Sequence, residues 1–182
     1  MCTVDVHGRR QWSTRVRFPA PDEETEVDVD TRSNGPVVVG VDGSPNSRHA
    51  LVRAGVYAQH IGAALVVVHA IGLTEEIDGN HVPTFGRRNE IAEHLDRWCD
   101  AAREAGVTEF DQQLIDGSPV DVLLRVAADT DAGTIVIGRR GIGGRPELLL
   151  GSTAHQVIEH APCAVLVIPP LGGSAASTSD PA

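Results

Sequence analysis

A glycine-rich segment with arginines and hydroxyl side chains is the part of the chain best suited to chemistry. It extends from Gly138 to Thr153 and reads GRRGIGGRPELLLGST. Glycine permits positive φ angles and lets the backbone approach a ligand closely, and successive N–H groups in such a turn form an anion site. Gly151 and Ser152 begin a predicted helix, whose free N–H groups and positive dipole end favour a phosphate. The segment therefore indicates phosphate binding, with a glycine-rich surface loop before a capped helix as the alternative.

The basic residues restrict this chemistry, because the chain has no lysine and all 15 basic residues are arginine. A lysine Schiff base, a Walker A loop and a protein kinase site are therefore excluded. A phosphate must be bound by backbone N–H groups, hydroxyls or guanidinium groups, and Arg139 and Arg140 can add charge-assisted contacts. The dinucleotide fingerprint also fails, because Pro146 stands where its third glycine is required and the segment follows the fourth predicted strand.

Other side chains that could react have simpler explanations. Asp42 could bind Mg²⁺ through water, but one carboxylate does not make a dedicated metal site. His155, Glu159 and His160 share a short predicted helix, in an order that matches no zinc-protease motif. We interpret them as an ordinary helix face and expect no protein-bound metal.

Composition and charge limit the partners and the compartment. The net charge of −10 over 182 residues argues against a broad surface for nucleic acid or anionic lipid. No apolar run approaches the ~18 residues that a membrane helix needs, and the N-terminus lacks the apolar core of a signal peptide. The three cysteines are far apart, which favours a reducing compartment. These features predict a cytoplasmic protein that binds neither nucleic acid nor membranes.

Alternating strand and helix patterns predict how these residues are positioned. The predicted strands are 36–42, 64–70, 108–115, 133–138 and 164–168. The predicted helices are 44 to about 60, 87–105, 118 to about 129 and 152–160. Short right-handed crossovers then give an α/β fold, a doubly wound five-stranded parallel sheet with helices on both faces. Ligands of such sheets bind beyond the carboxyl ends of the strands, so the loops after Asp42, Ala70 and Gly138 should form the site.

Several segments resemble the universal stress protein family. The spacing Gly-x2-Gly-x9-Gly-Ser that begins at Gly138 is similar to the Gly-x2-Gly-x9-Gly-Ser/Thr motif of the ATP-binding members. The stretch from Val38 to Ser44 resembles the family's first strand, which ends in Val-Asp-Gly-Ser. Leu65–Ala70 resembles its second strand, and Ala161–Pro169 resembles its closing segment. The resemblance covers nearly all of 36–170.

The resemblance implies an adenine nucleotide alpha-hydrolase-like fold that binds ATP, with Mg²⁺. The residues that it implies as nucleotide contacts are Asp42, Ala70, Ile137, Gly138, Arg140, Gly141, Gly151, Ser152 and Thr153. Asp42 would lie at the adenine and ribose end, with Ala70, Ile137 and Gly138 around the adenine. Arg140 and Gly141 would line the ribose and phosphates, and the residues from Gly151 to Thr153 would hold the phosphates. The family also implies a homodimer through the last strand, and Val165–Ile168 would otherwise be an unprotected edge.

We therefore expect an ATP-binding stress-response regulatory domain over 36–170. No set of general base, nucleophile and oxyanion donors is evident, so at most slow ATP hydrolysis is expected. The alternatives are a module for AMP or cyclic AMP, a dimeric interaction domain with an empty loop, and a phosphatase or nucleotidyl transferase. Residues 1–35 are predicted to be a disordered or extraneous tail, and 171–182 a flexible end.

Overall fold

The computed structural model describes most of the chain between the two predicted tails. The described residues are 2–4, 10–12, 35–72, 74–77, 80–107, 109–142 and 149–171. They belong to two compact units, 1–30 and 31–182. In the first unit, β1 (Cys2–Val4) pairs with β2 (Arg10–Trp12) in antiparallel orientation. The rest of 1–34 and residues 172–182 lie outside the described residues, so the interpretation of both ends stays a prediction.

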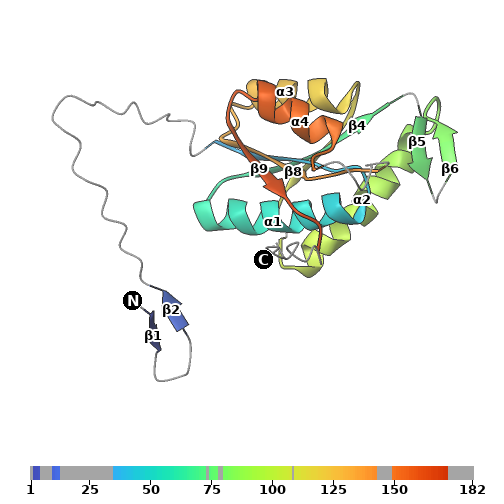
Figure 1. Cartoon of the computed structure of the whole chain (residues 1–182). Coiled ribbons are helices and arrows are strands. Elements are labelled where there is room, and N and C mark those ends of the chain that lie inside the picture. Colours follow the sequence, from blue (N-terminus) through green and yellow to red (C-terminus); the bar gives the residue numbers. More distant parts are fainter. Residues whose placement is uncertain are drawn as a thin grey trace, which may run out of the picture. The chain divides into compact units, whose positions relative to one another are not determined.

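Five parallel strands form the sheet of the second unit, in the order β7–β4–β3–β8–β9 (Figure 1). They are β3 (Val37–Gly40), β4 (Leu65–Ile71), β7 (Asp111–Asp116), β8 (Thr134–Gly138) and β9 (Ala164–Ile168). In the register, Val38 of β3 lies between Val66 of β4 and Ile135 of β8. The chain proceeds outward from β3 to β7 and then returns to the other side of β3 at β8. This reversal makes the carboxyl ends of β3 and β8 the expected ligand site.

Two helices cover each face of the sheet, as the sequence predicted. α1 (Pro45–Ile61) and α2 (Arg88–Glu104) lie on one face, and α3 (Pro119–Asp129) and α4 (Ser152–His160) lie on the other (Figure 1). α1 and α3 begin in the same way, with a serine side chain capping the first turn and proline at the first helical position. α1 ends at Gly62, whose φ of 68° is the left-handed conformation that glycine adopts without strain.

The central strand explains why both faces need helices. Val37 and Val39 pack with α1 and α2, whereas Val38 packs with α3 and α4, and all three side chains are completely buried. Successive residues of a strand point to opposite faces, so a continuous apolar run indicates a strand covered on both sides. Burial of each valine contributes about 1.5 kcal/mol or more to folding.

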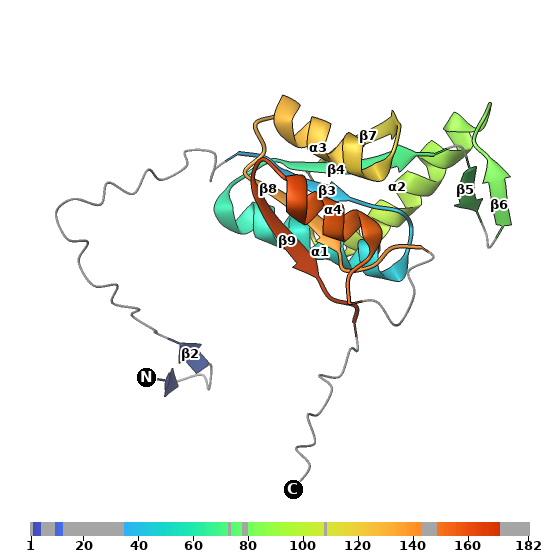
Figure 2. The ribbon, with the colours of Figure 1, turned by 45° about the horizontal axis from the view of Figure 1, so that its top comes forward.

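The segment 72–85, which lies between the predicted strand 64–70 and the predicted helix 87–105, contains a hairpin. β5 (Thr74–Ile77) and β6 (Asn80–Pro83) pair in antiparallel orientation beyond the end of β4 and beside the start of α2 (Figure 2). The Thr84 hydroxyl donates to the Gly72 carbonyl oxygen at 2.8 Å and closes the base of the hairpin. The sequence did carry a signal, because an Asp-Gly pair occupies 78–79, and this pair is favoured in two-residue hairpin turns.

Candidate functional site

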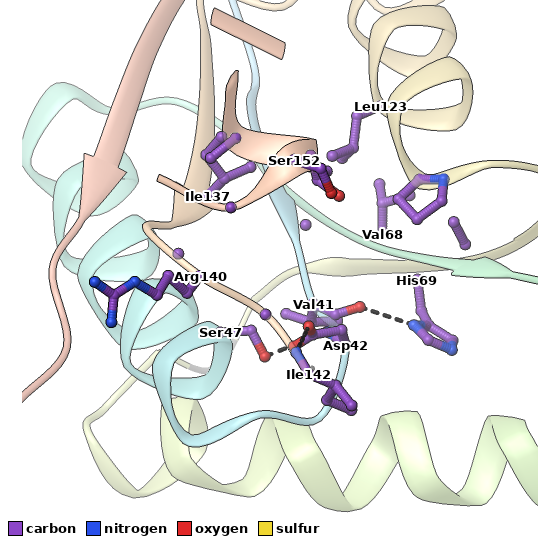
Figure 3. Close-up of a pocket in the computed structure, with 18 of the residues that line it drawn as sticks. Val41, Asp42, Ser47, Val68, His69, Leu123, Ile137, Arg140, Ile142 and Ser152 are labelled. Atoms are coloured by element: carbon purple, nitrogen blue, oxygen red, sulfur yellow. Dashed lines mark hydrogen bonds between the residues drawn. The ribbon is translucent and has the colours of Figure 1, made fainter. Parts of the chain in front are cut away.

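A cavity of about 450 Å³ lies at the carboxyl ends of β3, β4 and β8, beside the start of α4 (Figure 3). All nine residues predicted to contact a nucleotide line it. They are Asp42, Ala70, Ile137, Gly138, Arg140, Gly141, Gly151, Ser152 and Thr153. The structure thus brings together residues from the ends of β4 and β8, from the segments that follow β3 and β8, and from the start of α4. Their contacts with a ligand stay a prediction.

One end of the cavity is apolar and is closed by residues that the sequence analysis did not assign. Val68 and His69 of β4 and Leu123 of α3 line it together with Ile137 (Figure 3). His69 is buried, and its Nδ1 lies 2.8 Å from the Val41 carbonyl oxygen. Because a carbonyl only accepts, we assign the hydrogen to Nδ1. The aliphatic side chains of Val68 and Leu123, together with the His69 ring, make this end suitable for an aromatic base.

Trp98 of α2 supports the same end from behind. Its ring meets the His69 ring edge-on, with 5.1 Å between the centroids and 83° between the planes. It also packs beneath Gly43, where a Cβ atom would come within 2.4 Å of the indole ring. Gly43 has a φ of 79°, so both its conformation and its contact require glycine. The glycine of the Val-Asp-Gly-Ser sequence is therefore required for packing against Trp98, whatever the ligand.

The turn between β3 and α1 uses its polar groups within the protein. Ser44 accepts from the Ser47 N–H at 3.1 Å and so caps α1. The Asp42 carboxylate accepts twice, from the Ser44 N–H at 3.0 Å and from the Ile142 N–H at 2.8 Å. Asp42 was expected to face adenine and ribose, whereas here its carboxylate joins the turn to the glycine-rich segment.

The first two glycines of the motif, Gly138 and Gly141, are closely surrounded by other groups but do not have the positive φ that the sequence analysis expected. A Cβ at Gly141 would lie 2.1 Å from the Asp42 Oδ2 atom, and a Cβ at Gly138 would lie 2.9 Å from the Asn46 Nδ2 atom. Neither residue has a positive φ. Gly151 has an extended conformation with a φ of −72°. Gly143, Gly144 and Pro146 of the spacer lie outside the described residues.

Three backbone N–H groups near the motif already have acceptors in the protein. The Arg139 N–H donates to the Ile168 carbonyl oxygen at 2.8 Å, and the Gly151 N–H donates to the Arg139 carbonyl oxygen at 2.9 Å. The third is the Ile142 N–H, bound to Asp42. An anion at this site must therefore use other donors. α4 provides them, because it has no side-chain cap and begins with the Ser152 and Thr153 hydroxyls.

The charges that line the cavity favour an anion. The charged side chains among its lining residues are Asp42, Arg139 and Arg140. The formal charges of these three side chains sum to +1, in a chain whose net charge is −10. The Arg140 side chain extends away from Asp42 and His69 in the close-up (Figure 3). A local excess of positive charge in an acidic protein favours an anion at this place rather than over a broad surface.

Other titratable groups within the described ranges form no second site. No cluster of three or more His, Cys, Asp or Glu that could hold a metal occurs among them. Glu159 lies 3.9 Å from His155 and 4.0 Å from His160, and all three are exposed. Burial raises the pKa of the Cys99 thiol to about 11, which makes it a poor nucleophile. No helix in this part of the chain is long and apolar enough to cross a membrane.

Comparisons with known proteins agree on one family. The model of the universal stress protein family matches residues 34–169. A universal stress protein of Thermus aquaticus is 35% identical over 136 residues, which cover 72% of this chain and 96% of that protein.

Solved structures support the same assignment. A universal stress protein in complex with cAMP has a TM-score of 0.60 and 30% identity, and the match covers 75% of this chain and 98% of that one. A universal stress protein from Archaeoglobus fulgidus in complex with dAMP has a TM-score of 0.56 and 28% identity, with 74% and 97% covered. These neighbours have the adenine nucleotide alpha-hydrolase-like fold, and the predicted five-stranded α/β architecture is confirmed. The chain belongs to the universal stress protein family.

Proposed function

We propose that this chain binds ATP in the cavity and acts as a stress-response regulatory domain. The observation that carries the proposal is the uncapped start of α4, which faces a cavity with an apolar end and two arginines. The base would occupy the end near Val68 and His69. The phosphates would lie against Ser152 and Thr153, where helix N–H groups and hydroxyls favour negative charge.

Mg²⁺ would accompany the nucleotide without a dedicated protein site. Asp42 is the one carboxylate among the lining residues, and both of its oxygens accept from backbone N–H groups. Mg²⁺ commonly keeps several waters and binds through substrate phosphates. The lining residues therefore fit a magnesium ion that is coordinated by the phosphates and by water, and not directly by the protein. Bound Mg²⁺ would supply charge neutralisation to the triphosphate.

The function we propose is nucleotide holding, with at most slow hydrolysis. His69 is the one lining histidine, and its Nδ1 is bound to the Val41 carbonyl oxygen. The Ser47 hydroxyl, which also lines the cavity, donates to the Ser44 carbonyl oxygen at 3.0 Å. These groups are engaged in structure, and no pair of nucleophile and base is formed among the described lining residues.

A second candidate ligand is an adenine mononucleotide. One structural neighbour is described in complex with cAMP and another with dAMP. A mononucleotide would use the same apolar end and the same helix start, and it would leave part of the glycine-rich segment without a phosphate. A higher affinity for ATP than for AMP or cAMP would therefore depend on hydrogen-bond donors in the segment from Arg140 to Thr153.

We further propose a cytoplasmic homodimer that forms through β9. In the described sheet β9 pairs with β8 on one side only, and its Leu166 side chain is 38% exposed. An apolar edge strand is readily covered by a second copy. Residues 1–35 would be an appendage that nucleotide binding does not need.

The test is to purify the full chain without added ligand, denature it and analyse the released small molecules by liquid chromatography and mass spectrometry. We expect ATP in stoichiometric amount. Competition titrations with ATP, AMP and cAMP, each with Mg²⁺, then rank the ligands. A chain that releases no nucleotide, and whose melting temperature does not change at millimolar Mg-ATP, would contradict the proposal. Preferential release of AMP or cAMP would favour the second candidate.

A further inference from the structure

Two side chains, Asp42 between β3 and α1 and Asn46 in the first turn of α1, bind the two peptide groups that flank Gly141. The Asn46 side-chain Nδ2 donates to the Arg140 carbonyl oxygen at 2.9 Å. The Ile142 N–H donates to the Asp42 Oδ2 atom at 2.8 Å. Arg140, Gly141 and Ile142 all line the cavity, whereas Asn46 lies behind them and is not a lining residue. Asn46 therefore acts on the site through the backbone of the loop.

The contact with Asn46 determines which way the Gly141 N–H points. The carbonyl and the N–H of one trans peptide group point in opposite directions. Because Asn46 of α1 binds the Arg140 carbonyl, the Gly141 N–H of the same peptide group points away from α1. The Gly141 nitrogen lies 3.9 Å from the position that a Cβ would take on Gly151, at the start of α4. The oriented N–H is thus next to the helix end where we place the phosphates.

The surroundings of Asn46 indicate that stability is not its main contribution. Its Oδ1 atom is buried and has no hydrogen-bond partner in the part of the chain that the structure describes. A buried acceptor without a partner costs stability, and such groups call for an explanation. A Cβ at Gly138 would lie 2.9 Å from Nδ2, so the Asn46 side chain would have to shift to accommodate it. The first glycine of the motif is therefore coupled to Asn46.

We propose that Asn46 is a positioning residue that directs the Gly141 N–H toward the phosphate of a bound nucleotide. The inference rests on the proposed function and adds a residue that the motif does not contain. Without the amide of Asn46, the Arg140 carbonyl loses this hydrogen bond, and the peptide group between Arg140 and Gly141 can turn. It then presents its carbonyl oxygen to the phosphate, and that oxygen repels an anion.

The experiment compares the affinities of ATP and adenosine for the full chain and for the N46D and N46A variants. In N46D, a carboxylate of nearly the same shape faces the Arg140 carbonyl and cannot donate to it. We expect a loss of ATP affinity of about 10- to 100-fold, which is the range of a hydrogen bond to a charged group. Adenosine has no phosphate, so we expect its affinity to stay within about threefold.

The matched control is Gln59, near the other end of α1. Its side-chain Nε2 donates to the Gly106 carbonyl oxygen at 3.1 Å, so it too is an amide that binds a loop carbonyl. We expect Q59E and Q59A to leave both affinities unchanged. Because N46A removes a buried acceptor together with the donor, we expect its melting temperature to stay within about 3 °C of that of the unmodified chain.

Each outcome supports or overturns the inference. A selective loss of ATP affinity in both Asn46 variants supports it. Equal ATP affinity in N46D and the unmodified chain overturns the role of Asn46 and leaves the proposed function intact. A parallel loss of ATP and adenosine affinity overturns it as well, because Asn46 would then support the domain as a whole. Absence of ATP binding by the unmodified chain overturns the proposed function and, with it, this inference.

Discussion

The starts of α1 and α4 both lie at the cavity, but they use their backbone donors differently. α1 is capped by Ser44, and the neighbouring Ser47 hydroxyl and Asp42 carboxylate bind backbone groups of the same turn. α4 begins after Gly151, which has no side chain, and its first turn contains no acidic residue. One helix start is thus capped by the protein, and the other has no side-chain cap. Under the proposed function, this difference separates residues that stabilise the domain from residues that bind the nucleotide.

The strongest test of this comparison is to give α4 a cap like that of α1. We expect G151D to lower ATP affinity at least 100-fold, because a carboxylate would take the helix donors and repel the phosphates. The residue has an extended backbone, and a Cβ there makes only ordinary contacts of 3.4 Å or more. The free energy of unfolding should rise by a few tenths of a kcal/mol. Calorimetric titration and chemical denaturation measure the two effects.

The G151A variant distinguishes the effect of the added carboxylate charge from the effect of the added side-chain volume. It adds the same Cβ without a carboxylate, and we expect it to lose less than about tenfold in ATP affinity. Equal losses in G151A and G151D would mean that space, not the open helix donors, determines binding.

A smaller effect is expected from S152A. This variant removes one hydroxyl from the first turn of α4, and we expect about a tenfold loss of ATP affinity, the value of one hydrogen bond to a charged group. The Ser152 side chain is exposed, so the free energy of unfolding should change by less than about 0.5 kcal/mol. Titration with ATP measures the affinity, and thermal unfolding of the same sample measures the change in stability. Lower stability with unchanged affinity would assign Ser152 to structure.

S44A should show the opposite pattern. Loss of the cap on α1 should lower the free energy of unfolding by about 1 kcal/mol and the melting temperature by about 2–4 °C. ATP affinity should stay within about threefold, because the Ser44 hydroxyl serves the helix and not the cavity. If S44A instead lost ATP affinity at unchanged stability, the distinction between the two helix starts would be wrong.

The smallest effect concerns Cys99, which lies in the core between α2 and the sheet, away from both helix starts. Burial raises the pKa of its thiol from 9.0 to about 11, so the folded state favours the neutral thiol. The resulting contribution to stability is complete below about pH 9 and is lost as the pH rises toward 11. We expect C99A to show a weaker decline in melting temperature over this range. Equal declines in C99A and the unmodified chain would contradict this account.

The sequence predicted the fold and the location of the site well, because both depend on local patterns. Continuous valine runs indicate strands covered on both faces, and Ser-Pro pairs indicate helix starts. The resemblance to the family identified nine residues that line one cavity. Contacts between distant segments could not be predicted in this way. Asn46 looks like an ordinary first-turn residue until the fold places it 2.9 Å from the Arg140 carbonyl oxygen, 94 positions away in sequence.

The physical reason for each glycine was equally hidden in the sequence. A glycine suggests positive φ, but at Gly141 and Gly138 the structure shows that neighbouring side chains exclude a Cβ. Those neighbours are Asp42, which precedes α1, and Asn46, which lies in its first turn. The contribution of Trp98 beneath Gly43 likewise depends on how α2 packs, which no local pattern specifies.

The most direct test of the central claim is a calorimetric titration of the full chain with Mg-ATP, alongside G151D. We predict saturable binding of one ATP per chain by the unmodified protein and no measurable heat of binding by G151D at the same concentrations. Equal ATP binding by both proteins would show that the open start of α4 does not hold the phosphates, and it would contradict the assignment of this cavity as an ATP site.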